Sequence, residues 1–504
     1  MRSLVVVENV QRWPFELEGV EVVSARDYLT SDAFLQLRGA VVYNVCRRYS
    51  YQSLGYYVSL LAAARGHRPI PSVSTLQAVG LSPVLRTISS DLDPDLQRLL
   101  APLRSDSFDL SIYFGRNLTR RYDPLARALF DEFPAPFLRA RFLRDREGRW
   151  RLNRLRPIAT SEIPDTHRDF VLEQATRYFG RRAGPRRPRE YQYSMAILWS
   201  AEDPGSPSNA RAIRRLIRAA GREGIEASII DREEAPRIAE YDALFLRETT
   251  AVEHHTYRLA RRAAQEGLVV IDDPDSIIRC SNKVYQAELF RRHRIPAPPT
   301  LVVHEGNAHQ IATEVGLPCV LKRPDGSFSR GVMKAETEAE LERLLPDLFR
   351  ESDLLVAQAW TPSTFDWRIG ILGGRPLFAA RYHMARGHWQ IIRGDGGEGT
   401  DFGRVEAVPL GEVPALVMKT ALRAAAPIGK GFYGADVKEV EGEALVMEVN
   451  DNPNLDAGYE DRVEGEAVYR EIMRHFRREL DARGGKRDPE AVEGKDPSGS
   501  GAES

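Results

Sequence analysis

The chain has 504 residues, of which 42% are hydrophobic and 28% charged, and its formal net charge at pH 7 is −1. This composition is typical of a globular protein of about three domains of roughly 150 residues each, and the balanced charge favours neither nucleic acid nor an anionic membrane as a partner. The three cysteines are scattered and no apolar run is long enough to span a membrane, so we expect no disulfide framework, no zinc motif and a cytoplasmic location.

The first 180 residues are predicted to form an α/β unit. Short apolar runs at 4–8, 20–25 and 39–45 are typical of parallel strands, and residues 50–67 have the apolar spacing of a helix that ends at Gly66. The tyrosines near the start of this helix are expected to pack against it, and contact with a substrate is the alternative.

A hairpin is predicted at 136–159, after a strand at 109–117 and a helix at 123–133. Its turn is expected at 145–148. Its arginines alternate with apolar residues, as on a strand with one buried face. We interpret these arginines as a solvated face, and a site for an acidic ligand is the alternative.

Residues 181–194 are rich in Pro, Gly and Arg and are predicted to form a linker. A second α/β unit with apolar strands and amphipathic helices follows at 195–275. No G-x-G-x-x-G motif follows its first strand, so a dinucleotide site is not expected. A third unit is predicted at 276–480, and the tail at 481–504, rich in Gly, Ser and charge, is expected to be disordered.

The third unit contains a candidate metal site in the hairpin at 434–461. Apolar residues flank a polar break at 441–443, which predicts two strands around a three-residue turn. In that register Asp436 faces Glu448, and Asn450 shares a face with Glu448 because side chains alternate along a strand. Two carboxylates and an amide suit a hard cation such as Mg²⁺.

Lysine is rare in this chain, because only eight of the 71 basic residues are lysines and none precedes Lys283. A compact ammonium group binds phosphate without the planar fork of arginine, so the sparse lysines are candidate phosphate ligands. Lys283 begins a predicted helix, and Lys322 ends a predicted strand. The loop at 325–331 that follows contains glycines, and its backbone N–H groups could cover phosphates.

Further polar residues lie near the predicted strands of the same unit. The apolar strand 354–360 is a candidate hinge beside an adenine, and Asp366 and Arg368 precede a predicted strand at 369–372. Arg381 belongs to the next predicted strand, and Arg393 precedes a glycine-rich stretch. The alternative is that Arg368 and Arg381 brace the hairpin by pairing with Asp366.

These motifs follow one another in the order found in ATP-grasp ligases. Residues 276–480 resemble that fold, and within it the RimK-type glutamate ligases, in GLPCVLKRPDGSFSRGV, FDWRIGIL and ADVKEV…MEVNDNP. Residues 1–180 resemble the N-terminal domain of RimK-like ATP-grasp proteins, and 195–275 are similar to their pre-ATP-grasp domain. The resemblance implies an α/β chain whose ligase domain is α+β.

The resemblance also implies which residues would form the site. Residues expected to hold ATP are Lys283, Lys322, Asp325, Gly326, Ser327, Gly331, Gln358, Trp360 and Asp366. Residues expected to surround the γ-phosphate and the substrate carboxylate are Arg368, Arg381 and Arg393. One or two Mg²⁺ ions, or Mn²⁺ as an alternative, would bind Asp436, Glu448 and Asn450.

The implied activity is an ADP-forming ligation of a carboxylate to an amine through an acyl-phosphate, on amino acid or peptide substrates. No nucleic-acid or membrane partner is expected, and a homo-oligomer is compatible with the resemblance. The alternatives are an ATP-grasp phosphotransferase and a nucleotide-binding regulator without catalysis. The hinge lacks the acidic second residue of RimK-type ligases. Residues 451–458 replace their Ser-Ser-Pro-Gly-like turn, which borders the substrate pocket, so we expect these residues to recognise the substrate, and glutamate is not identified as that substrate.

Overall fold

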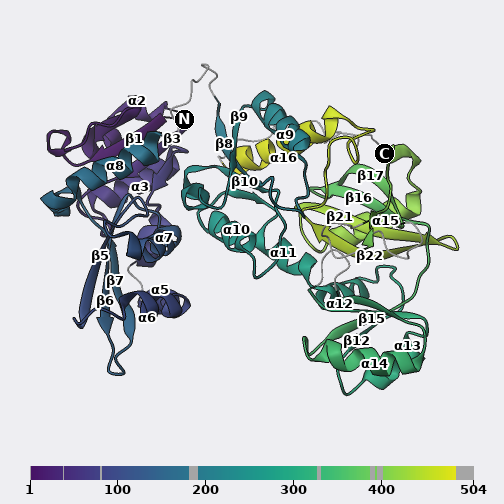
Figure 1. Cartoon of the computed structure of the whole chain (residues 1–504). Coiled ribbons are helices and arrows are strands. Elements are labelled where there is room, and N and C mark those ends of the chain that lie inside the picture. The colour runs from purple at the N-terminus through teal and green to yellow at the C-terminus, as the bar shows by residue number, and fades with distance from the viewer. Residues whose placement is uncertain are drawn as a thin grey trace, which may run out of the picture.

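The computed structural model describes residues 2–37, 39–79, 82–180, 191–325, 331–385, 392–393 and 401–483. Its three units follow one another in space as they do in the chain, with the N-terminal unit at one end and the third unit at the other (Figure 1). Parallel and antiparallel sheets with covering helices confirm the predicted α/β class. Within these ranges no helix is both long and apolar enough to cross a membrane. Most of the predicted linker and tail lies outside the described residues.

The N-terminal unit begins with a parallel sheet in the order β2-β1-β3-β4. Its strands and helices are β1 (Arg2–Val7), β2 (Val20–Ser24), β3 (Ala40–Asn44), β4 (Arg68–Ile70), α1 (Ala25–Thr30), α2 (Asp32–Leu35), α3 (Leu54–Ala64), α4 (Val73–Val79) and α8 (Arg168–Gly180). Strand β1 sends alternate side chains into two separate apolar clusters, so both faces of the sheet are buried. The parallel strands expected from the continuous apolar runs are confirmed.

The predicted arginine-containing hairpin is confirmed as part of an antiparallel sheet, β5-β6-β7. Its elements are β5 (Ser107–Tyr113), β6 (Phe137–Arg144), β7 (Trp150–Pro157), α5 (Ser82–Asp91), α6 (Asp93–Leu100) and α7 (Asp123–Glu132). The three helices cover one face of this sheet, and its apolar side chains pack there (Figure 1).

The second unit has a parallel sheet in the order β11-β10-β8-β9. Its elements are β8 (Tyr193–Leu198), β9 (Ile225–Ile230), β10 (Ala243–Leu246), β11 (Val269–Ile271), α9 (Ala210–Arg222), α10 (His255–Gln265) and α11 (Pro274–Ser281). Strands β8 and β10 are neighbours, so the chain changes direction across the sheet between β9 and β10. The carboxyl ends of strands at such a switch point are where loops meet to form sites.

The third unit has two antiparallel sheets, in the orders β12-β15-β13-β14 and β20-β17-β16-β21-β22, and a small pair β18-β19. The strands are β12 (Thr300–Val303), β13 (Cys319–Lys322), β14 (Val332–Ala335), β15 (Leu355–Ala359), β16 (Phe365–Leu372), β17 (Arg375–His383), β18 (Ile392–Arg393), β19 (Asp401–Phe402), β20 (Val405–Val408), β21 (Phe432–Val440) and β22 (Glu443–Asp451). The helices are α12 (Lys283–Arg292), α13 (Ile311–Glu314), α14 (Glu338–Phe349), α15 (Ala415–Ala425) and α16 (Glu466–Arg483). Asp366 and Arg368 lie inside β16, which begins earlier than predicted.

The β21–β22 hairpin has the predicted pair Asp436 and Glu448, but its turn differs from the prediction. Val440 pairs with Glu443, so the turn has two residues, Glu441 and Gly442, both with positive φ. A β-bulge after Asp436 adds one residue to β22 and shifts the register by one. The shorter turn and the bulge compensate each other, which is why the predicted pair is still formed.

Helix α16 belongs by sequence to the third unit but packs on the sheet of the second. Phe476 and Met473 share an apolar cluster with Ile213 of α9 and Phe245 of β10. The same cluster includes Phe432 at the start of β21. The second and third units are therefore joined by one continuous core.

Candidate active site

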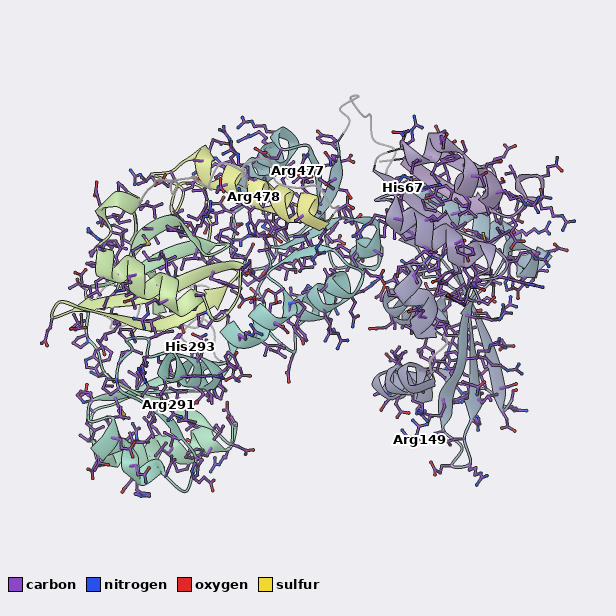
Figure 2. All side chains as sticks on the ribbon, turned by 180° about the vertical axis from the view of Figure 1, so that it is seen from behind. His67, Arg149, Arg291, His293, Arg477 and Arg478 are labelled. Carbon is purple, nitrogen blue, oxygen red and sulfur yellow. The ribbon has the colours of Figure 1, made fainter. Side chains whose placement is uncertain are left out.

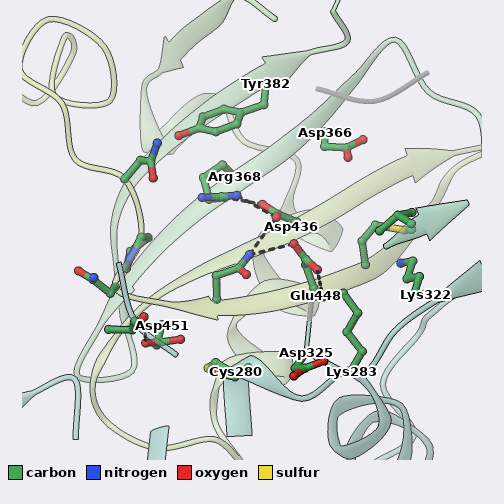
Figure 3. Close-up of a pocket in the computed structure, with 18 of the residues that line it drawn as sticks. Cys280, Lys283, Lys322, Asp325, Asp366, Arg368, Tyr382, Asp436, Glu448 and Asp451 are labelled. Atoms are coloured by element: carbon green, nitrogen blue, oxygen red, sulfur yellow. Dashed lines mark hydrogen bonds and ion pairs between the residues drawn. The ribbon is translucent and has the colours of Figure 1, made fainter. Parts of the chain in front are cut away.

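A cavity of about 470 Å³ lies among the two sheets of the third unit and the loop that follows β10 (Figure 3). Most predicted site residues in the described ranges line it. These are Lys283, Lys322, Asp325, Gln358, Trp360, Asp366, Arg368, Asp436, Glu448 and Asn450. Pockets of a few hundred Å³ with a few convergent polar groups are typical of small-molecule sites.

The predicted acid–amide trio is brought together on one face of β21 and β22. Asn450 donates from Nδ2 to Asp436 Oδ2 at 3.2 Å and to Glu448 Oε1 at 3.3 Å (Figure 3). The β pairing explains this contact, because Asp436 and Glu448 are directly opposed and Asn450 is two residues further along β22.

The two predicted lysines reach the same face from α12 and from β13 of the other sheet. Lys283 is the first residue of α12, whose side-chain cap is Asn282, and its Nζ lies 3.9 Å from Glu448 Oε2. Lys322 ends β13 and donates from Nζ to Gln358 Oε1 at 2.8 Å. Gln358 is expected beside the adenine, and it also orients Lys322, which is a candidate phosphate ligand.

Burial and neighbouring charges set the protonation of these groups. Burial lowers the pKa of Lys322 to about 8, and Glu448 opposes this shift. Burial alone would raise the pKa of Glu448, but Lys283 and Lys322 outweigh it and the pKa is lowered. Glu448 is therefore ionised at neutral pH, with two ammonium groups around it.

Arg368 binds both oxygens of Asp436, with Nη2 to Oδ2 at 2.9 Å. Burial raises the pKa of Asp436 to about 6, although Arg368 lowers it. The alternative pairing of Arg368 with Asp366 is not found. Asp366 instead accepts a hydrogen bond at 2.7 Å from Lys438, which also lines the cavity.

Lys438 was not predicted as a site residue. It is one of the eight lysines of the chain, and it lies two residues after Asp436 on the same face of β21. Its rarity and its even spacing from Asp436 were the signals that could have identified it.

Arg381 does not enter the cavity, contrary to the prediction. It pairs with Trp367 across β16 and β17, and its guanidinium stacks over the Trp367 ring at 4.8 Å and the Phe365 ring at 5.2 Å. Since side chains alternate along a strand, Arg381 and its neighbour Tyr382 face opposite sides, and Tyr382 is the residue that lines the cavity.

Several predicted residues are not placed at the cavity. Gly326 and Ser327 lie outside the described residues, and so does the side chain of Arg393. Gly331 is described but does not line the cavity; its φ of +70° and the closeness of Arg323 leave no room for a side chain. Asp325 lines the cavity where β13 meets α12, and there the Lys283 N–H donates to the Pro324 carbonyl at 2.8 Å.

A second wall of the cavity comes from the second unit and was not predicted. It consists of residues 249–253 after β10, which face residues 451–454 after β22. Thr250 donates to Asp451 Oδ2 at 2.7 Å. Arg247 stabilises the wall. It is fully buried and donates hydrogen bonds to Asn452 Oδ1 and to the Pro207 and Pro453 carbonyls.

Comparison with known proteins finds a family model that matches part of the N-terminal unit and several proteins that are similar to part of the chain. Residues 25–174 match the family model of the RimK-like ATP-grasp N-terminal domain. A protein of Saccharolobus solfataricus named alpha-aminoadipate–LysW ligase LysX is 29% identical over 196 residues, which are 38% of this chain and 68% of that protein. A "Probable alpha-L-glutamate ligase" of Maridesulfovibrio salexigens is 24% identical over 221 residues, 43% of this chain and 70% of that protein.

Residues 25–174 are a RimK-like ATP-grasp N-terminal domain. The predicted relationship to RimK-type ATP-grasp ligases is confirmed by this match and by the named relatives. Among solved structures, the RimK-domain ATP-grasp protein of Sphaerobacter thermophilus is similar with a TM-score of 0.43 and 18% identity, over 56% of this chain and 98% of that chain.

The acid–amide donors of the cavity fit a hard divalent cation. Asp436, Glu448 and Asn450 offer two carboxylates and an amide in one contact group, and such oxygen ligands suit Mg²⁺. The Asp436 carboxylate is already paired with the Arg368 guanidinium, so a metal ion that bound Asp436 would replace this guanidinium as its positive partner. Among the described residues no three His, Cys, Asp or Glu side chains gather as a metal site, so waters or a substrate would complete the ligands.

Proposed function

We propose that the protein is an ATP-dependent carboxylate–amine ligase that forms an amide or peptide bond on an amino acid or peptide substrate. One observation carries the proposal: Lys283, Lys322 and Arg368 converge on two carboxylates inside one cavity between two sheets. Phosphoryl transfer depends mainly on positioning and on neutralising charge, and this cavity supplies both. Relatives named as amino-acid ligases support the same class.

In the proposed reaction a substrate carboxylate oxygen attacks the γ-phosphorus of ATP. The bond from that phosphorus to the β,γ-bridging oxygen breaks, and ADP leaves. The amine nitrogen then attacks the acyl carbon, the bond from carbon to the phosphate oxygen breaks, and phosphate leaves while the amine gives up its proton. Two anions must meet in the first step, so Lys283 and Lys322 would hold the phosphates and Arg368 the carboxylate.

Asp436, Glu448 and Asn450 would hold one or two Mg²⁺ ions, which neutralise phosphate charge when bound. Asp366 would bind the ribose and Gln358 to Trp360 the adenine. We further propose residues 276–480 as the catalytic domain, with 1–180 and 195–275 as its two companions. The loops at 326–331 and 394–403 are proposed to exclude water, which would hydrolyse an acyl-phosphate.

The test is ADP release by the full-length protein in mixtures of amino acids and dipeptides, with mass spectrometry of the product. We expect ADP to depend on the substrates and to appear with an amide. Glu448→Gln and Lys322→Met are expected to lower the rate by about a hundredfold or more. The matched control is Lys419→Met, which removes an exposed lysine on α15 and should leave the rate unchanged.

Each alternative predicts a different result. A phosphotransferase would release ADP with a phosphorylated product and no amide. A regulator would bind ATP without releasing ADP. If turnover persists in Glu448→Gln and Lys322→Met at the level of Lys419→Met, the proposed site is wrong.

A further inference from the structure

The antiparallel sheet of the N-terminal unit has one face that α5, α6 and α7 do not cover, and α8 packs only on the end of this face at Tyr113 and Phe137. On this face Arg139 of β6 lies directly opposite Arg156 of β7, and Arg141 lies directly opposite Arg154. We call these four arginines the basic face. The opposite side of the sheet holds the apolar core and helices α5, α6 and α7 (Figure 1). Packing of the core therefore does not require the arginines.

Like charges directly opposite across a β pair destabilise it, so two such pairs in succession need an explanation. Neighbouring acids balance the charge only in part. Glu162 accepts from Arg156 with both carboxylate oxygens, at 3.1 Å and 2.5 Å, and its backbone carbonyl accepts from Arg139 at 2.9 Å. Asp109 lies 3.8 Å from Arg141.

Two arginines of the basic face are available to a ligand. Arg141 has 53% of its side chain exposed, and its ion pair with Asp109 is long. Arg154 is exposed and has no ion pair or hydrogen bond among the described residues. The four guanidinium groups outnumber the two neighbouring acids, so the basic face carries an excess of positive charge although the net charge of the chain is −1.

The spacing of the basic face matches an extended peptide. Arg139 and Arg141 are two residues apart on one strand, which is about 6.8 Å, and this is also the distance between side chains i and i+2 of an extended peptide. The planar guanidinium fork binds carboxylates with two parallel hydrogen bonds. Alternating acidic side chains could therefore meet both rows of arginines at once.

We propose that the basic face is a docking surface for an acidic, extended peptide segment of a protein partner. The spacing of the arginine rows, which matches alternate side chains of an extended peptide, decides for a peptide over nucleic acid. The aromatic side chains of this face, Tyr113 and Phe137, are buried, so neither of them is free to stack on a base.

The experiment measures binding of a fluorescent peptide of alternating glutamate and serine to the full-length protein by anisotropy. We expect binding that weakens with salt. The double variant Arg141→Gln with Arg154→Gln should weaken it about threefold to thirtyfold, the range for two lost surface ion pairs. A peptide with glutamine in place of glutamate should not bind.

The control variant is Arg291→Gln with Arg292→Gln, which removes the same charge from exposed positions of α12, where Arg291 is labelled in Figure 2. It should keep the affinity of the unchanged protein. Equal loss in both double variants would mean a non-specific charge effect and would overturn the proposal. Tighter binding of a single-stranded RNA that competes with the peptide would assign the face to nucleic acid instead.

Thermal unfolding separates docking from a bracing role. Because the paired arginines repel each other, Arg141→Gln with Arg154→Gln should leave the melting temperature unchanged or raise it. A fall in melting temperature together with unchanged peptide affinity would show that the arginines stabilise the sheet and would contradict the proposal. ADP release should be the same in this variant as in the unchanged protein.

Discussion

At the scale of single residues, burial decides how the charged groups of the cavity behave. Lys322 and Asp436 have pKa values shifted by burial toward their neutral forms, while their partners favour the charged forms. The residue types could be predicted from sequence, because sparse lysines and a Glu-x-Asn motif are visible there. Their partners could not: Lys438 with Asp366 and Lys322 with Gln358 depend on which strands become neighbours.

The first prediction concerns protons taken up when ATP binds. The pKa of Lys322 is about 8 in the free cavity, below its ordinary value of 10.5. Between these values the lysine is largely neutral in the free protein, and nearby phosphates would favour its charged form. ATP binding near pH 9 should therefore take up close to one proton, and below pH 7 the lysine should add none.

Calorimetry in buffers of different ionisation enthalpy measures this proton uptake, and Lys322→Met should abolish it. Persistence in that variant would contradict the assignment.

The second prediction concerns the pair of Lys438 and Asp366, whose side chains are 10% and 12% exposed. Removing one partner of a buried pair leaves the other charge without compensation, at a cost of about 3 kcal/mol or more. Lys438→Met should therefore lower the free energy of unfolding in urea by about that amount. Adding Asp366→Asn should recover part of the loss, since the stranded carboxylate is removed. Additive losses in the double variant would mean that the two residues do not interact.

At the scale of elements, the alternation of side chains determines which arginines can reach a substrate. The strands and their directions could be predicted from apolar runs, and the pair of Asp436 and Glu448 was predicted correctly. The bulge in β22 could not be predicted, because apolar alternation alone does not reveal one extra residue. The predicted position of Arg381 in the site was wrong for a similar reason. Because β16 was predicted to begin after Arg368, the residue that pairs with Arg381 could not be identified, and neither could the side of the sheet on which Arg381 lies.

The third prediction tests the corrected position of Arg381. This side chain stacks on Trp367 and Phe365 outside the cavity, so Arg381→Met should change substrate-dependent ADP release less than about twofold. Stability should fall by about 0.5–1 kcal/mol, the usual value of a cation–π contact. Arg368→Met is the comparison, and it should lower the rate by about a hundredfold. A loss of that size in Arg381→Met would restore its predicted role.

At the scale of the whole molecule, the second and third units are joined around the end of the β21–β22 hairpin. Helix α16 packs on α9, and Asp272 after β11 accepts the N–H groups of Phe432 and Asn452 at 2.6 Å each. Contacts between residues 160 and 180 positions apart cannot be predicted from local patterns. The core that joins the second unit to the third was therefore not predicted.

The last prediction follows from Arg247, whose guanidinium donates to Asn452 and Pro453 on one side of the wall and to Pro207 of the second unit on the other. Arg247→Met would leave the Pro207 and Pro453 carbonyls without their donor, so stability should fall by about 3 kcal/mol or more. The wall at 249–253 and 451–454 contains none of the residues proposed to bind ATP, so the KM for the carboxylate and amine substrates should rise at least about tenfold while the Kd for ATP changes less than about threefold. Arg214→Met, at an exposed position of α9, is the control and should alter neither. An equal loss of ATP and substrate affinity would mean that Arg247 supports the whole site and has no selective effect on the substrate wall.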